Sequence, residues 1–300
     1  MHINELEKID GLGCGCFRDG EFDAVALLGR RKNEDERHIS FVGAMKYLPQ
    51  VKEGGIECII CPPGIAEEIG NAYDGGIATS DDPKTALFTI HEYLAGRRGE
   101  TPSVISDTAR ISDSAKISGV NVVIGENVVI EENVVVRPNT FIGDGSVIMA
   151  NTVVGGPAFY YYGSGDGRKM VCSSGGVKIG KNVHVHSNTS ICRGVIGGFT
   201  ELRDNCAVAE NVTISHDVIL GEGTIIALGA QLGGWVQIGT DNFVGIGADI
   251  APNVKTGENV KISMGSVVTR DVPADTQVSG NYAVDHDLFI SDLKNKLRLK

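Results

Sequence analysis

The chain has 300 residues, of which 42% are apolar and 6% are aromatic, and it contains 40 glycines. Its formal charge of −11 and isoelectric point near 5.1 argue against a nucleic-acid partner, which would need a basic face. The start MHINELEKIDGLGCGC lacks a signal-peptide pattern and the seven cysteines are scattered, so we expect a cytoplasmic protein with reduced thiols.

Residues 1–100 predict a small α/β domain, because they carry no long repeat and mix short helix and strand patterns. We expect a helix at the start, strands at HISFVGA and IECIIC, and a helix over 83–94 that begins just after Asp82. The polar, proline-bearing RRGETPS near residue 100 is the expected linker to the next domain.

From residue 101 to 270 an aliphatic residue recurs at every sixth position outside one interruption, with Thr256 the only polar member. This period fits neither a helix nor a single strand, and it is typical of a hexapeptide β-helix, in which three repeats form one triangular coil. Each inward side chain stacks on one about 18 positions away, and the register slips by one at Gly119. A buried core is therefore expected from Ile105 onward at Ile105, Ile111, Ile117, Ile124, Ile130, Val136, Ile142, Ile148, Val154, Ile179, Val185, Ile191, Ile196, Leu202, Val208, Ile214, Leu220, Ile226, Leu232, Ile238, Val244, Ile250, Thr256, Ile262 and Val268.

Residues 155–178 interrupt this repeat, and a loop of that length inside a regular solenoid is usually functional. Residues 223–240 carry no charge, but they keep the six-residue register, so we predict a buried coil and no transmembrane segment. The tail over 271–300 is expected to contain a short amphipathic helix.

Six stretches together resemble the UDP-3-O-acylglucosamine N-acyltransferases, which are left-handed β-helix enzymes of lipid A biosynthesis. In the first domain they are HISFVGAMKYLPQV, IECIICPP and DDPKTALFTIHEYL, and in the repeats they are VVGGPAFYYYGSGDGRKM, NVHVHSNTSICRG and NVTISHDVILGE. Their order and spacing carry the resemblance over nearly the whole chain. It implies a mainly β protein, a left-handed parallel β-helix with a small N-terminal α/β domain, that forms a homotrimer with active sites between subunits.

The resemblance also implies an activity. The family moves a hydroxyacyl chain from acyl carrier protein to the 2-amine of a UDP-linked acylated glucosamine, which it holds partly through a uridine-binding first domain. It binds no permanent cofactor, since the donor is acyl-phosphopantetheine on acyl carrier protein.

Four positions depart from the family pattern. Asn253 stands where the family has a second histidine, Pro157 and Cys192 stand where it has aspartates, and Ala44 replaces an asparagine of the uracil pocket. The ending MGSVVTRDVPADTQVSGN is similar to that of acetyltransferases acting on nucleotide-linked amino sugars. Acetyl-CoA is therefore the alternative donor.

Acyl transfer from a thioester to an amine needs a general base and a hydrogen-bond donor for the oxyanion. His216 follows the inward Ile214 by two positions, so it projects from the coil near a corner and can act as the base, although an exposed histidine without a role fits the residues alone. Gly234 lies one coil beyond, where the resemblance assigns the oxyanion donor. Asp217 is expected to point away, because adjacent side chains on a strand alternate.

Substrate-binding residues follow from the resemblance. Phe41 and Tyr47 match the aromatic pair that brackets the uracil ring, and Asn253 occupies a site position. Tyr160 and Tyr162 in the interruption are expected to cover the acyl or sugar site, with packing or a subunit contact as the other interpretation.

No metal site is predicted. His184 and His186 point outward, as do the zinc ligands of the γ-type carbonic anhydrases that share this fold, but they lie on another face of the coil from His216. Two cysteine pairs could be imagined as a zinc site, but one pair lies in a strand and the other has an unusual CxC spacing; the residues are Cys14, Cys16, Cys58 and Cys61.

Three functions remain open at this point: the N-acyltransferase, an acetyl-CoA-dependent N-acetyltransferase of nucleotide-linked amino sugars, and a trimeric β-helix scaffold without catalysis. The interruption and the added α/β domain favour an enzyme, because a scaffold needs only a featureless wall.

Overall fold

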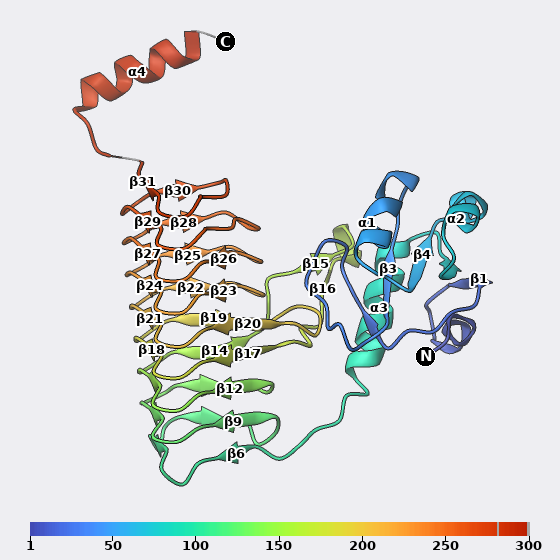
Figure 1. Cartoon of the computed structure of the whole chain (residues 1–300), viewed down its shortest axis with the longest axis horizontal. Coiled ribbons are helices and arrows are strands. Elements are labelled where there is room, and N and C mark those ends of the chain that lie inside the picture. The colour runs from blue at the N-terminus through green and yellow to red at the C-terminus, as the bar shows by residue number, and fades with distance from the viewer. Residues whose placement is uncertain (281, 299–300) are drawn as a thin grey trace.

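The structure is a computed structural model that describes residues 1–280 and 282–298. A tall prism of stacked coils carries a smaller α/β unit at its side and a helix beyond its C-terminal end (Figure 1). Residues 281, 299 and 300, all in the tail predicted at 271–300, lie outside the described residues.

The prism is a left-handed parallel β-helix, as predicted, with three long sheets as its walls. The nine-stranded wall contains β7 (Arg110–Ile111), β10 (Val129–Ile130), β13 (Val147–Ile148), β18 (His184–Val185), β21 (Ala207–Val208), β24 (Ile225–Ile226), β27 (Phe243–Val244), β29 (Lys261–Ile262) and β31 (Gln277–Val278). The eight-stranded wall contains β8 (Lys116–Ile117), β11 (Val135–Val136), β14 (Val153–Gly156), β19 (Ser190–Cys192), β22 (Thr213–Ile214), β25 (Gln231–Leu232), β28 (Asp249–Ile250) and β30 (Val267–Val268). The seven-stranded wall contains β6 (Val104–Ile105), β9 (Val122–Ile124), β12 (Thr140–Ile142), β17 (Gly176–Ile179), β20 (Phe199–Leu202), β23 (Ile219–Leu220) and β26 (Gln237–Ile238).

The predicted stacking is confirmed along most of the prism. Ile214 pairs with Leu232 and Leu232 with Ile250, each 18 residues on, and the slip at Gly119 appears as the 19-residue step from Ile105 to Ile124. The inward side chains from Ile124 onward form one continuous apolar core. The polar exception, Thr256, is buried and accepts a hydrogen bond from Asn242.

Between Ile124 and Ile262, the third residue after an inward position turns the chain at a corner with a positive φ, except where an interruption follows Val154 and Ile191. Asparagine, aspartate and glycine tolerate this left-handed conformation, and they occupy nearly all of these corners. The asparagines of the recurrent NV pairs in the sequence therefore lie at corners, as Asn133 and Asn211 do.

Two predicted core positions are wrong. Ile105 is 42% exposed because no coil lies below β6 to cover it. Ile196 lies outside the prism core. After Ile191, the next inward residue along the chain is Leu202, which stacks on Ile179, so residues 193–198 form a second interruption. Ile196 packs instead against the core of the α/β unit.

The α/β unit has one five-stranded sheet in the order β1-β5-β4-β3-β2, with β1 antiparallel and the others parallel. Its strands are β1 (Gly15–Arg18), β2 (Ala24–Val25), β3 (His38–Phe41), β4 (Cys58–Cys61) and β5 (Gly76–Thr79). One face packs on η1 (Ile3–Lys8) and α3 (Pro83–Ala95), and the other on α1 (Leu48–Glu53) and α2 (Ala66–Ala72). Two short 3-10 turns, η2 (Met45–Tyr47) and η3 (Pro63–Ile65), precede α1 and α2. The predicted helix over 83–94 is confirmed, and Asp82 caps it by accepting from the Thr85 N–H.

The interruption at 155–178 folds back as a small hairpin of β15 (Tyr161–Tyr162) and β16 (Lys169–Met170), with η4 (Gly165–Gly167) between them. Phe88 of α3 is fully buried in a cluster with Ala158, Tyr162, Val171 and Val195. The hairpin and the second interruption thus hold the α/β unit against the prism.

The tail forms α4 (His286–Arg298), which confirms the predicted short helix. Within the described residues, no helix is both long and apolar enough to span a membrane.

Candidate functional site

The corner between the eight- and seven-stranded walls gathers the features that depart from regular repeats. Both interruptions leave the prism there, the first between β14 and β17 and the second between β19 and β20. His216 lies at the same corner between β22 and β23, and Gly234 between β25 and β26. One corner therefore carries both the predicted catalytic pair and the two interruptions that contact the α/β unit.

His216 is nearly buried, with 5% of its surface exposed. Its Nδ1 atom lies 3.0 Å from Oδ2 of Asp217. A carboxylate can only accept, so Nδ1 carries the proton and Nε2 is left free to take one. This is the protonation pattern that a general base needs.

The expectation that Asp217 points away from His216 is wrong. Asp217 has a φ of 58° and turns the corner, so the alternation of an extended strand does not apply to it. The Asp217 carboxylate also accepts a hydrogen bond from the Val195 N–H at 3.0 Å, and the backbone N–H of Asp217 donates to Oγ1 of Thr200 at 2.8 Å. These bonds fix the carboxylate that orients His216.

Gly234 lies directly against the imidazole. A Cβ atom on Gly234 would stand 2.6 Å from Nε2 of His216, so no larger residue fits there without displacing the ring. The Gly234 carbonyl accepts from the Asn253 N–H, whereas no residue in the described part of the chain accepts from the Gly234 N–H. An unused backbone donor beside a base is suited to binding an oxyanion.

Two aromatic rings enclose the imidazole. The Trp235 ring centroid lies 4.3 Å from that of His216 at an interplanar angle of 86°, and the Tyr160 centroid lies 5.9 Å away. Tyr160 also meets Trp235 edge to face. Burial raises the pKa of the Tyr160 hydroxyl, so it stays protonated near neutral pH. Of the predicted tyrosines, Tyr160 is thus at the site.

Arg30 reaches the corner from the α/β unit. Its guanidinium carbon lies 4.0 Å above the centre of the Trp235 ring, and Nη1 donates to Oδ1 of Asn253. Burial lowers the pKa of Arg30, while Tyr160 and Asp217 act in the opposite direction. An arginine nevertheless keeps its charge at neutral pH, so the site contains a fixed cation.

The remaining predicted residues lie apart from this cluster. Tyr162 is buried on Phe88, with ring centroids 5.0 Å apart, and its hydroxyl lies 3.4 Å from Glu92. Phe41 ends β3 and packs partly against the core of the α/β unit. Tyr47, in η2, is 40% exposed with the Lys46 ammonium over its ring. Substrate contact by these three side chains stays a prediction.

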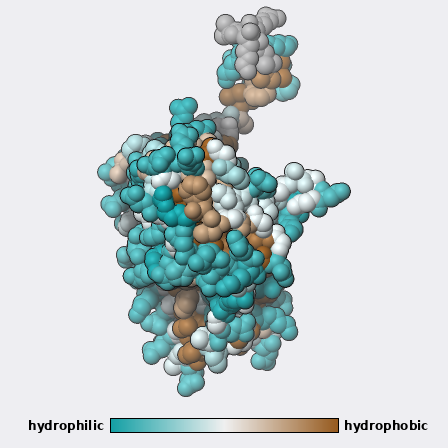
Figure 2. Space-filling model, turned by 90° about the vertical axis from the view of Figure 1, so that its right-hand side faces the viewer, coloured by the Kyte–Doolittle hydropathy of each residue, from teal (hydrophilic) through white to brown (hydrophobic). Residues whose placement is uncertain are grey.

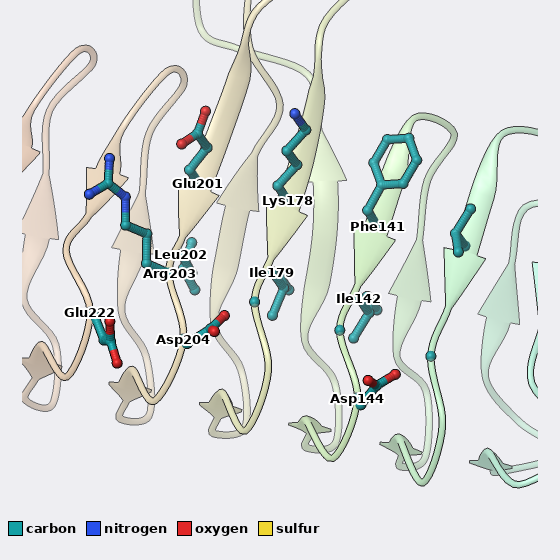
Figure 3. A pocket seen from close by; sticks show the side chains of 14 residues that line it. Phe141, Ile142, Asp144, Lys178, Ile179, Glu201, Leu202, Arg203, Asp204 and Glu222 are labelled. Carbon is teal, nitrogen blue, oxygen red and sulfur yellow. The ribbon is translucent and has the colours of Figure 1, made fainter.

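A groove of about 580 Å³ runs along the outer face of the seven-stranded wall. Phe141, Lys178 and Glu201 project outward from β12, β17 and β20, opposite to the inward aliphatic residues (Figure 3). The groove does not include His216 or Gly234. It meets the α/β unit through an ion pair of 3.0 Å between Arg31 and Glu201.

Possible metal ligands are dispersed. No group of three or more histidine, cysteine or acidic side chains within the described residues is arranged to hold a metal ion. His186 pairs with Glu210 at 3.1 Å on another corner, and Cys58 and Cys61 belong to different core clusters on the two faces of the sheet.

Sequence reasoning missed two residues of the cluster, Arg30 and Trp235. Trp235 had a signal, because it occupies a corner position at which other coils carry asparagine, aspartate or glycine. Arg30 had none, since it meets Asn253 across 223 residues of sequence.

Comparison with known proteins places the prism among related molecules. Residues 121–156 match the family described as bacterial transferase hexapeptide (six repeats). A UDP-3-O-acylglucosamine N-acyltransferase from Shewanella denitrificans is 27% identical over 168 residues, which cover 53% of this chain and 49% of that protein. An acyl-[acyl-carrier-protein]–UDP-N-acetylglucosamine O-acyltransferase from Nautilia profundicola is 30% identical and covers 52% of this chain and 59% of that protein. The solved UDP-N-acetylglucosamine acyltransferase from Campylobacter jejuni shares 27% identity, covering 65% of this chain and 81% of that chain with a TM-score of 0.51.

These matches confirm the resemblance to hexapeptide-repeat acyltransferases and the left-handed β-helix fold. The chain spans about half the length of the Shewanella relative that it matches.

Proposed function

We propose that this hexapeptide-repeat protein is an N-acyltransferase that moves an acyl chain from acyl carrier protein to the amine of a UDP-linked acylated glucosamine. The observation that carries the proposal is the His216 imidazole, with Asp217 on Nδ1 and Gly234 against Nε2. His216 takes the proton of the attacking amine, and the free Gly234 N–H stabilises the tetrahedral oxyanion. The C–S bond of the thioester then breaks, and the phosphopantetheine thiol leaves with the proton that His216 returns. The relatives supply the substrate class.

The α/β unit is proposed to bind the uridine end of the acceptor, through Phe41 and Tyr47. Both residues lie at the carboxyl end of β3, the edge of a parallel sheet at which ligands commonly bind. The Arg30 loop follows β2 at the same edge and extends to Trp235, which packs on His216, so a bound nucleotide-sugar can run from this edge to the base. Residues 1–100 thus form the proposed nucleotide domain.

A homotrimer is the proposed assembly. Leu228, Ile246 and Met264 recur at 18-residue intervals on one corner of the prism, and their side chains are about half exposed. A column of three apolar side chains in water is a candidate subunit contact. Replacing Ile246 by Glu should dissociate the trimer, as seen by light scattering, whereas replacing the exposed Val104 at the lower end should not. A monomeric wild-type protein would exclude this assembly.

The function is tested with purified protein and paired substrates. Acyl carrier protein loaded with a hydroxyacyl chain, or acetyl-CoA, is offered with a UDP-linked 3-O-acylglucosamine, and the product is identified by mass spectrometry. UDP-N-acetylglucosamine serves as a parallel acceptor, because O-acyltransferases of that sugar are among the relatives. An amide product from the acyl carrier protein donor supports the proposal. Turnover of acetyl-CoA alone, or an ester product alone, would replace it.

A further inference from the structure

Trp235 has a backbone conformation that its side chain disfavours. Its φ is 61°, and each of the other non-glycine residues with a positive φ within the described chain is an asparagine or an aspartate. A bulky side chain in this region is a genuine outlier, and such outliers concentrate at functional sites. The tryptophan therefore does something at this corner that an asparagine would not.

The contacts of Trp235 indicate what it does. One part of the indole meets His216, and its face lies under the Arg30 guanidinium at 4.0 Å. A planar guanidinium stacked on an indole is held in one orientation while its N–H groups stay directed outward at its edge. Trp235 is a platform for Arg30 beside the base.

Arg30 lacks the partner that its neighbours have. Within residues 1–280 and 282–298, no carboxylate oxygen lies within 4.0 Å of its guanidinium, and the one side chain that accepts a hydrogen bond from it is the neutral Asn253. Arg31 is paired with Glu201 and Lys32 with Glu34. Asp217 is near enough to favour the charge on Arg30, but its carboxylate bonds His216 and Val195. A half-buried, oriented and unpaired guanidinium is suited to receiving an anion.

The position of Arg30 selects the kind of anion. A cavity of about 550 Å³ opens beside it, and it is lined by Arg30, Arg31, Lys32, Glu34, Glu53, Gly54 and Gly55. Arg31 and Lys32 are each paired with a glutamate, so Arg30 is the cation of this lining that has no carboxylate partner. Figure 2 shows the side of the molecule on which the α/β unit lies, where hydrophilic surface surrounds a band of more apolar residues. Arg30 follows the carboxyl end of β2, the neighbour of β3, and lies over Trp235 beside His216. The diphosphate of a nucleotide-linked sugar would pass Arg30 if its base lay at that edge and its amine at His216.

We propose that Arg30, seated on Trp235, binds the diphosphate of the acceptor and so places the sugar amine at His216. This proposal rests on the proposed function for the identity of the ligand, but the anion site itself does not. Bidentate hydrogen bonds from a guanidinium suit phosphate oxygens. Arg30 would exchange its bond to Asn253 for the phosphate.

Calorimetry on the full chain with uridine, UDP and inorganic pyrophosphate tests the site. The wild type should bind UDP about tenfold more tightly than uridine, and Arg30→Met should remove most of that difference while leaving uridine affinity unchanged. Pyrophosphate affinity should fall by a similar factor. Arg31→Met makes the same change of charge at the adjacent position, but Glu201 already neutralises Arg31, so its effect should be much smaller.

The outcomes separate this proposal from the proposed function. Pyrophosphate binding that depends on Arg30, with no binding of uridine or UDP, would keep the anion site and reject the nucleotide-sugar acceptor. Equal affinities of wild type and Arg30→Met for pyrophosphate and UDP would overturn the site. Equal losses of pyrophosphate affinity in Arg30→Met and Arg31→Met would show that general surface charge attracts the anion, and would overturn the site as well.

Trp235→Asn tests the platform. Asparagine is the usual residue at these corners, so the variant should fold, which circular dichroism checks, while pyrophosphate affinity falls as in Arg30→Met. Unchanged pyrophosphate affinity in folded Trp235→Asn would overturn the role of the tryptophan.

Discussion

The Nδ1 atom of His216 lies 3.0 Å from the carboxylate of Asp217, although the two residues are adjacent in sequence. The pairing exists because Asp217 turns the corner with a positive φ. It orients the imidazole so that Nε2 faces Gly234. The proposed base and its orienting group are thus supplied by one corner of one coil.

Replacing His216 by Ala should lower the rate of acyl transfer by roughly 10²- to 10⁴-fold, or about 3 to 5 kcal/mol, because the amine proton then has no acceptor. His184→Ala is the matched control, since that histidine is exposed on another wall. Initial rates and light scattering of both variants check the prediction. Near-full activity in folded His216→Ala would rule out the base.

Replacing Asp217 by Asn should reduce kcat by roughly 10- to 100-fold with little change in KM. The Val195 N–H and Nδ1 of His216 share one oxygen, Oδ2, so the amide oxygen can keep both hydrogen bonds. The amide has no negative charge, however, and does not stabilise the imidazolium that forms when His216 takes a proton. When Asp217→Asn is added to His216→Ala, the rate should fall no further. Additive losses would contradict an action of Asp217 through the imidazole.

Replacing Phe88 by Ala should release the hairpin of the first interruption, because Phe88 is fully buried against it. Loss of this side chain should cost about 3 to 5 kcal/mol. Trypsin cleavage at the exposed Arg168 and Lys169 should accelerate under native conditions. Phe22→Ala, equally buried but within the α/β core, is the control, and equal cleavage of the two variants would argue against a local effect.

The buried His91 should make stability depend on pH. Burial lowers the pKa of His91, and a hydrogen bond from its Nε2 to the Cys172 carbonyl at 2.8 Å opposes this only partly. As the pH falls through about 6.5, the unfolded chain takes up a proton on His91 and the folded chain does not. The free energy of unfolding is therefore at its full value above that pH and falls as the pH drops below it.

His91→Gln keeps a donor for the same carbonyl and removes the titration. Urea unfolding at pH 7, 6 and 5 should show a slope reduced by up to about 1.4 kcal/mol per pH unit relative to wild type. His38, whose pKa burial also lowers, remains and leaves part of the slope. An unchanged slope would show that His91 does not contribute.

The sequence predicts the prism well because each coil repeats a local rule. An inward aliphatic residue and a left-handed corner three positions later recur within six residues, so Ile214 and Asp217 can be placed without knowledge of the rest. Ile196 shows the limit of this rule. It lies six residues before Leu202 by coincidence, and only the strand pairing reveals that an interruption intervenes.

The site is predicted less completely because half of it comes from distant chain segments. His216 and Gly234 stand one coil apart, so the repeat brings them together. Arg30 and Tyr160 arrive through the docking of the α/β unit and the hairpin, which depends on packing such as that of Phe88. No local pattern encodes such a meeting.

The two interruptions change the number of residues per coil without disturbing the wall. Ile142 pairs with Ile179 after 37 residues and Ile179 with Leu202 after 23, yet both pairs stack as do those separated by 18. Length at this one corner is therefore uncoupled from the integrity of the core. Evolution can change the proposed substrate-facing edge by insertion while selection for folding acts elsewhere, and an engineer could graft new loops at the same two points.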